Sequence, residues 1–133
     1  MTEPRYPDLQ TSLDQGVLVL TITATQLSDW DLCNRLRHEL VDAWTRSPVQ
    51  KVVLDFGRVE FISSVAFTPL ISLLRKVEAA GGRIVLCSLS PTIEAVFRVT
   101  RFLLDPQAAT GLFDYAPDVS LAQAMLNAGQ QRK

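Results

Sequence analysis

The feature that most constrains the fold is a short apolar run followed by turn residues and then by a longer amphipathic segment. The run consists of Val52, Val53 and Leu54, and Asp55 ends it. Because so few residues cannot form a helix, the run predicts a buried strand. The later segment places apolar residues at helical spacing, which are Phe67, Leu70, Ile71, Leu74 and Val77. Residues 51–82 therefore predict a strand, a loop and a helix in succession.

Two adjacent hydroxyl side chains, Ser63 and Ser64, stand where this loop leads into the helix. The first backbone N–H groups of a helix lack partners within the helix, and the helix dipole is positive at that end. A serine at this place suits two roles, which are capping the helix and carrying an anionic group. On the residues alone, capping is the more common of the two.

The dipeptide Thr68-Pro69 leaves two places at which the helix can begin. A late start would use Thr68 as the N-cap and Pro69 as the first helical residue. A start at Ser64 would place the proline within the first turn, where it removes a hydrogen bond and distorts the helix. We favour the early, distorted start because Val65 and Phe67 have the character of core residues.

The rest of the chain alternates between predicted strands and helices. Strands are expected at 9–13, 17–22, 83–87 and 111–115, and turn residues at 14–16 join the first two into a hairpin. The other helices are expected to begin at capping residues, which are Ser28 with Asp31, Ser90 before Pro91, and Asp118 or Ser120. This order predicts an α/β fold with a mixed, mostly parallel sheet of about five strands and about four helices. We expect one domain over residues 1–133, with an ordered core at about 9–126.

The composition argues against several classes of protein. The chain has 133 residues, of which 47% are hydrophobic and 20% charged, as is typical of a folded domain. A net charge of −1 provides no basic field for nucleic acid. No apolar run approaches the roughly 18 residues of a membrane helix, and the N-terminus lacks the apolar core of a signal peptide. We therefore expect a cytoplasmic protein in which Cys33 and Cys87 are buried free thiols.

Side chains for catalysis or metal binding are sparse. His38 is the single histidine, and no cluster of Cys, Asp or Glu accompanies it, so no metal site is expected. No spacing pairs it with a cysteine as base and nucleophile, and glycine-rich phosphate loops are missing from the sequence. We expect no cofactor and no enzymatic activity. The tryptophans at the two ends of the first helix, Trp30 and Trp44, are expected to be packing residues.

Two separate pieces of the sequence carry a family pattern. The first contains Leu54-Asp55-Phe56, then Val59, and then Phe61-Ile62-Ser63-Ser64 before the amphipathic helix. The second runs through residues 82–87 into Ser90-Pro91 and on to residues 96–100. Over about residues 9–126, the chain resembles the STAS domain, which is the fold of bacterial anti-sigma factor antagonists and of the cytoplasmic tail of sulfate transporters.

The resemblance assigns roles to the two serines. In the family, the loop before the central helix reads Asp-Ser-Ser/Thr-Gly-Leu, and a partner kinase phosphorylates the serine that follows the aspartate. This alignment places Ser64 at the phosphorylated serine and Ser63 at the aspartate, with Val65 and Ala66 at the next two positions. The chain thus lacks the charge of that aspartate and whatever it does in kinase recognition. It offers Ser64 and Ser63 as adjacent candidates for phosphorylation.

The resemblance implies a phospho-switchable protein-binding module. An anti-sigma factor antagonist of this kind binds an anti-sigma serine kinase when it is unphosphorylated, and a PP2C-type phosphatase removes the phosphate. That kinase and that phosphatase are the implied partners, and the chain is expected to be a monomer or a weak dimer. Two other roles stay open, which are a scaffold subunit of a larger signalling complex and an auxiliary subunit of a lipid or anion transport system.

The expected partner-binding residues are Asp55, Arg58, Glu60, Ser63 and Ser64. Asp55 would order the serine loop or contact the kinase; the alternative is that it only accepts hydrogen bonds from turn amides. Arg58 and Glu60 would contact a partner at the rim of an interface, and otherwise they are simply solvated loop charges.

Overall fold

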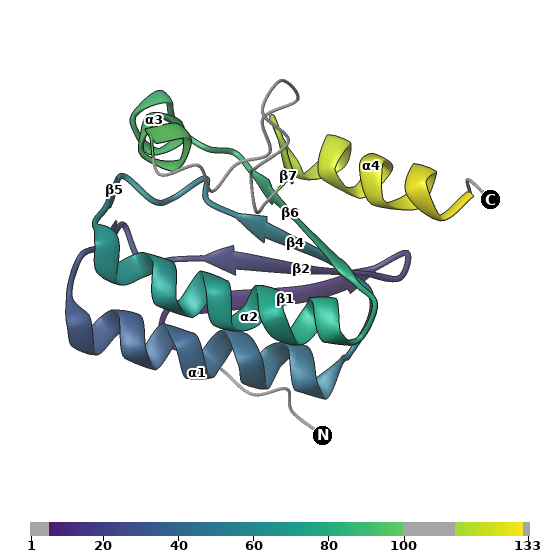
Figure 1. Cartoon of the computed structure of the whole chain (residues 1–133), viewed down its shortest axis with the longest axis horizontal. Helices are drawn as coiled ribbons and strands as arrows, with labels where there is room; N and C mark the ends of the chain where they lie inside the picture. The colour runs from purple at the N-terminus through teal and green to yellow at the C-terminus, as the bar shows by residue number, and fades with distance from the viewer. Residues whose placement is uncertain (1–5, 100–113, 132–133) are drawn as a thin grey trace.

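The strand, loop and helix expected at 51–82 form the centre of the fold in a computed structural model, which describes residues 6–99 and 114–131 (Figure 1). The elements in chain order are β1 (Leu9–Asp14), β2 (Val17–Ile22), β3 (Gln26–Leu27), α1 (Trp30–Arg46), β4 (Lys51–Asp55), β5 (Phe61–Ile62), the short 3-10 turn η1 (Ser64–Ala66), α2 (Phe67–Ala79), β6 (Arg83–Cys87), α3 (Pro91–Val99), β7 (Asp114–Ala116) and α4 (Val119–Gln131).

The main sheet has five strands in the order β1-β2-β4-β6-β7. β1 and β2 pair antiparallel, and the other neighbours pair parallel. Gln15 and Gly16 form the hairpin turn with φ of 54° and 78°, which matches the right-handed twist of the strands that they join. The predicted fold class, a mixed and mostly parallel five-stranded sheet with four helices, is therefore confirmed for the described residues.

Helices cover both faces of this sheet. Helices α1 and α2 lie side by side on one face, and α4 lies on the other (Figure 1). Strand β4 is buried from both sides because Val52 and Leu54 face α1 and α2, whereas Val53 faces α4. A central parallel strand must be apolar on both faces, which explains why its sequence is a continuous apolar run and not an alternating one.

Helix α3 packs against the end of the sheet and against the start of α2. The Phe97 ring meets Phe56, which follows β4, edge to face with centroids 5.7 Å apart. It meets Phe67, the first residue of α2, in the same manner at 5.6 Å. This aromatic group fixes the segment after β4 and the N-terminus of α2 relative to each other, and the two serines lie between those points in the sequence.

Three details differ from the expectations or fall outside the described residues. The prediction of Ser28 as the cap of α1 is wrong: Asp29 occupies the N-cap, and its Oδ2 accepts a hydrogen bond from the Leu32 N–H at 2.8 Å. The two-residue strands β3 and β5, which pair in parallel, were not predicted. The strand expected at 111–115 overlaps β7, which spans Asp114–Ala116. Residues 111–113 lie outside the described residues.

Candidate functional site

The residues Ser63–Ala66, called here the serine turn, connect β5 to α2. Strand β5 pairs with β3, and the Ser63 N–H continues this pairing by donating to the Leu27 carbonyl at 3.0 Å. Ser63 is extended, with φ −121° and ψ 179°, and its carbonyl accepts from the Ala66 N–H at 3.0 Å. Ser63 is half-buried, and Ser64, the first residue of η1, is exposed. The structure thus brings both serines to the start of the helical segment, as the sequence predicts.

Neither serine has the capping role that is common for this position. Ser63 occupies the N-cap of η1, but its side chain makes no capping hydrogen bond. The residue before α2 itself is Ala66, which has no hydroxyl to offer. Within residues 6–99 and 114–131, neither serine hydroxyl has a hydrogen-bond partner. The Ser64 side chain is therefore available for chemistry without the loss of a bond that supports the fold.

The central helix begins early and with a distorted first turn, as favoured from the sequence. The chain enters a 3-10 turn at Ser64 and becomes α-helical at Phe67, whose N–H donates to the Ser64 carbonyl. Pro69 is the third residue of α2 and is buried. The missing N–H of the proline is tolerated there because the N–H groups of the first turn of an α-helix have no carbonyl partner within that helix.

Asp55 makes the bond expected of an acid at the end of a strand. Its Oδ1 accepts the Gly57 N–H at 2.8 Å and thereby closes the turn after β4. Arg58 and Glu60 are exposed, and neither forms an ion pair with another residue in the described ranges. The Glu60 N–H donates to the Thr25 carbonyl at 2.7 Å, which attaches this loop to the segment before β3. Asp55 thus acts inside the loop, whereas Arg58 and Glu60 present their charges to solvent.

Two aromatic side chains at this end of the molecule were not recognised as surface residues. Trp30, expected to be a packing residue, is 65% exposed, and Phe61 in β5 is 50% exposed. Trp44 does pack, and its indole N–H donates to the Val49 carbonyl at 2.9 Å. Helical spacing alone could not have shown that Trp30 is exposed, because it lies three residues before the buried Cys33.

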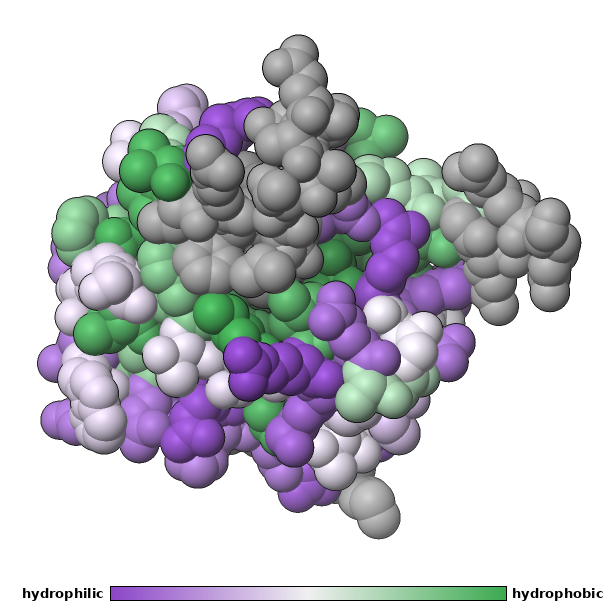
Figure 2. Space-filling view, in the orientation of Figure 1, coloured by the Kyte–Doolittle hydropathy of each residue, from purple (hydrophilic) through white to green (hydrophobic). Residues whose placement is uncertain are grey.

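The two aromatics flank the serine turn because the pairing of β3 with β5 brings their elements together. Trp30 begins α1 shortly after β3, and Phe61 lies in β5 itself. In Figure 2, the front surface along α1 is largely hydrophilic, and apolar side chains gather toward the end at which β5 and α3 lie. Exposed aromatic residues are typical anchors of protein–protein interfaces. The exposed Ser64 follows the exposed Phe61 by three residues in the chain.

The described residues hold no cluster of metal ligands, and both of their cysteine thiols are buried. In the part of the chain that the structure describes, no group of three or more His, Cys, Asp or Glu side chains is placed to hold a metal ion. Burial raises the pKa of the Cys87 thiol to about 12 and also raises the pKa of Cys33, so both stay protonated and unreactive at neutral pH. Among the described helices, none is long and apolar enough to cross a bilayer.

Comparisons with known proteins agree with one family. A family model described as the STAS domain matches residues 9–111. BtrV of Bordetella bronchiseptica, provisionally named as an anti-sigma factor antagonist, is 35% identical over 54 residues, which cover 41% of this chain and 47% of that protein. The chain thus matches about half the length of this curated relative.

Solved structures show the same fold at low sequence identity. An anti-sigma-factor antagonist (STAS) domain protein from Planctomyces limnophilus superimposes with a TM-score of 0.72 at 20% identity, over 90% of this chain and 97% of the other. The Bacillus cell fate determinant SpoIIAA in its phosphorylated form superimposes with a TM-score of 0.60 at 19% identity. This match covers 88% of this chain and 98% of the other.

Proposed function

Because this chain belongs to the STAS domain family, we propose that it is an anti-sigma factor antagonist whose partner binding is controlled by phosphorylation of Ser64. In its unphosphorylated form it binds an anti-sigma serine kinase. Phosphorylation by that kinase releases it, and a PP2C-type phosphatase restores the binding form. The observation that carries this proposal is the exposed Ser64 side chain at the first residue of a helical turn, with no hydrogen-bond partner in the described residues.

The phosphorylation step requires no catalytic group of this chain. The Ser64 Oγ attacks the γ-phosphorus of ATP held by the kinase, and the bond between that phosphorus and the leaving oxygen of ADP breaks. The hydroxyl proton passes to a base of the kinase. This chain supplies only an accessible hydroxyl, and no intramolecular bond of Ser64 has to be broken first.

The fold is expected to tolerate the phosphate. A phosphoserine carries a charge of about −1.5 to −2 at neutral pH. At the N-terminus of a helix, such a charge is favourable by about 0.3–1 kcal/mol. The neighbour that replaces the family's aspartate, Ser63, is uncharged and adds no repulsion. Modification at Ser64 therefore leaves the scaffold folded.

A bound partner responds differently from the scaffold. A protein packed over Ser64 would have to remove water from the newly added phosphate charge. A loss of about 2.8 kcal/mol of binding free energy weakens affinity roughly a hundredfold. One local charge can thus release the partner while the domain keeps its structure.

The exposed aromatics complete the proposed contact surface. Trp30 and Phe61 flank the serine turn and supply apolar area. Arg58 and Glu60 contribute charges at the rim, where single contacts contribute little to affinity. Asp55 supports the surface from inside by holding the Gly57 turn at 2.8 Å.

The proposal is tested with the purified cognate kinase and ATP. We expect mass spectrometry to find one phosphate, on Ser64. In pull-downs, Ser64→Ala is expected to retain the kinase and Ser64→Asp to lose it, and Ser63→Asp serves as the matched control for an added charge next to the site. A phosphate on another residue, or equal kinase binding by Ser64→Asp and Ser64→Ala, would contradict the proposal.

A further inference from the structure

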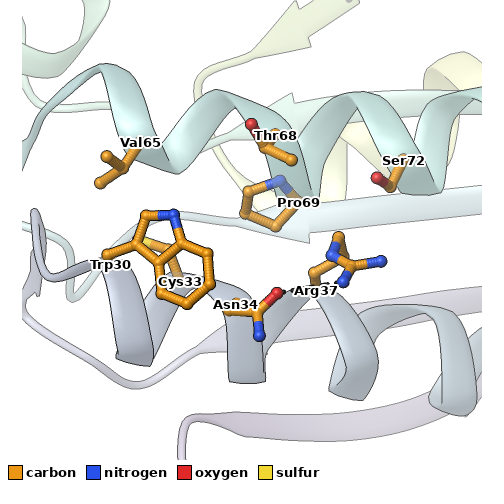
Figure 3. A pocket seen from close by; sticks show the side chains of 8 residues that line it. All are labelled: Trp30, Cys33, Asn34, Arg37, Val65, Thr68, Pro69 and Ser72. Atoms are coloured by element: carbon orange, nitrogen blue, oxygen red, sulfur yellow. Dashed lines mark hydrogen bonds between the residues drawn. The ribbon is translucent and has the colours of Figure 1, made fainter.

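A groove runs between α1 and α2 and begins beside the serine turn. Its volume is about 320 Å³, which is at the lower end of the volumes typical of binding pockets. Figure 3 shows Trp30, Asn34 and Arg37 along α1, facing Val65, Pro69 and Ser72 on the other side. Val65 directly follows Ser64 in η1, so a protein that covers Ser64 also reaches the mouth of this groove.

The two ends of the groove differ in chemistry. Trp30, which is 65% exposed, and Val65 form an apolar end next to the serine turn. Farther along α1, Asn34 and Arg37 form a polar end, opposite the Ser72 hydroxyl (Figure 3). A segment that fits this groove needs an apolar side chain at one end and a polar one at the other.

Arg37 determines the sign of the charge that the groove prefers. It is the one charged residue among the described residues that line the groove. Its guanidinium donates a hydrogen bond to the Asn34 Oδ1 at 3.0 Å and lies 3.5 Å from a His38 ring nitrogen, and it forms no ion pair with a carboxylate of the described residues. By contrast, Arg35 and Arg46 on the same helix pair with Asp8 at 2.9 Å and Asp42 at 3.0 Å. Arg37 therefore remains available for an incoming carboxylate.

We propose that this groove binds a segment of the anti-sigma kinase that carries an acidic side chain for Arg37 and an apolar side chain for the Trp30–Val65 end. The inference rests on the proposed function, since it assigns the groove to the same partner. The charge of Arg37 and the contact of the groove with the serine turn favour this occupant.

Charge reversal tests the groove directly. The affinity of the purified cognate kinase is measured by calorimetric titration against the wild-type chain, Arg37→Glu and the neutral variant Arg37→Gln. The matched control is Arg75→Glu, an exposed position on α2 that does not line the groove. We expect Arg37→Glu to weaken binding at least about tenfold, which corresponds to about 1.4 kcal/mol, and Arg75→Glu to change it less than about twofold. Arg37→Gln, which loses the charge but not the polar head, carries the test if Arg37→Glu fails to fold.

A second readout reports occupation of the apolar end. In a Trp44→Phe background Trp30 is the single tryptophan, and we expect the kinase to protect its fluorescence from quenching by acrylamide. Unchanged affinity of the Arg37 variants, tighter binding by Arg37→Glu, equal losses in Arg75→Glu, or unprotected Trp30 in the complex would each overturn the groove assignment.

The two proposals fail in different ways. If Arg37→Glu loses the kinase but Ser64→Asp binds as the wild type does, the groove assignment stands and the switch at Ser64 is wrong. If Ser64→Asp loses the kinase but the Arg37 variants bind normally, the switch stands and the groove assignment is wrong. A kinase that does not bind the wild-type chain overturns both.

Discussion

The Phe97 ring of α3 meets the Phe67 ring, at the start of α2, edge to face, with centroids 5.6 Å apart and an interplanar angle of 72°. Phe97 is fully buried. This contact holds the first residue of the α-helix directly behind the serine turn, so the position of Ser64 depends on a side chain that is far away in the sequence.

Truncation of Phe97 should therefore be costly. We expect Phe97→Ala to lower the free energy of unfolding by about 3–5 kcal/mol, as is usual when a buried phenylalanine is removed. Val99→Ala on the same helix is the control, because Val99 is 83% exposed, and its change should stay within about 0.5 kcal/mol. Urea unfolding measures both, and equal effects of the two substitutions would contradict the packing role.

The helix starts should differ in their dependence on a capping side chain. Asp29 accepts the Leu32 N–H at 2.8 Å, whereas the Ser63 side chain makes no capping bond. Replacing Asp29 by Ala is expected to cost about 1 kcal/mol, and Ser63→Ala less than about 0.5 kcal/mol. Thermal or urea unfolding of the two variants provides the comparison. A larger loss for Ser63→Ala would show that this serine supports the fold after all.

Stability should fall at alkaline pH because of Tyr6. Its hydroxyl donates to the Asp42 Oδ2 at 2.6 Å, and burial together with this carboxylate raises the pKa of Tyr6 to about 12. In the unfolded chain, the pKa of a tyrosine is about 10. The raised pKa favours folding fully below about pH 10 and progressively less as the pH rises toward 12.

The measurement is the free energy of unfolding across that pH interval for the wild type and for Tyr6→Phe. Burial also raises the pKa of Cys87 to about 12, so the wild type has a second alkaline contribution of the same sign. The difference in the free energy of unfolding between the wild type and Tyr6→Phe isolates the contribution of the Tyr6 hydroxyl. This difference should shrink as the pH rises. A constant difference across the interval would exclude the hydrogen bond as its cause.

The turn between α2 and β6 should not accept a side chain at Gly82. A Cβ built there would lie 2.7 Å from the Gln50 carbonyl oxygen and 2.7 Å from the Val77 Cγ1. We expect Gly82→Ala to cost about 1–3 kcal/mol, because backbone and a buried side chain both have to move. Gly57→Ala is the milder comparison, since its Cβ would meet the Asp55 Oδ1 at 3.1 Å, the end of a side chain that can rotate. Similar losses for both would contradict the steric argument.

The parts of the fold that local patterns determine were predictable. The apolar run 52–54, the helical spacing of α2 and the hairpin turn at Gln15 and Gly16 each have a signal within a few residues. The early start of α2 also followed from local reasoning, because Val65 and Phe67 had to reach the core. That both serines lie beside the helix start could be predicted from this segment alone.

The remaining features depend on contacts between distant residues. Strands β3 and β5 have two residues each, and they exist because Leu27 and Ile62 pair across the fold. No pattern within two residues can predict such a pairing. Trp30, at one end of the predicted first helix, was expected to be a packing residue, and only the position of α1 against α2 places it at the rim of a groove.

The pairing of β3 with β5 also has a consequence for recognition. It links the strand before α1 to the strand before α2, and the Ser63 N–H extends the link by donating to the Leu27 carbonyl at 3.0 Å. The beginnings of both helices are thereby held in one fixed arrangement before any partner arrives. A protein that binds across them meets a preorganised surface, so that little conformational entropy is lost there on association.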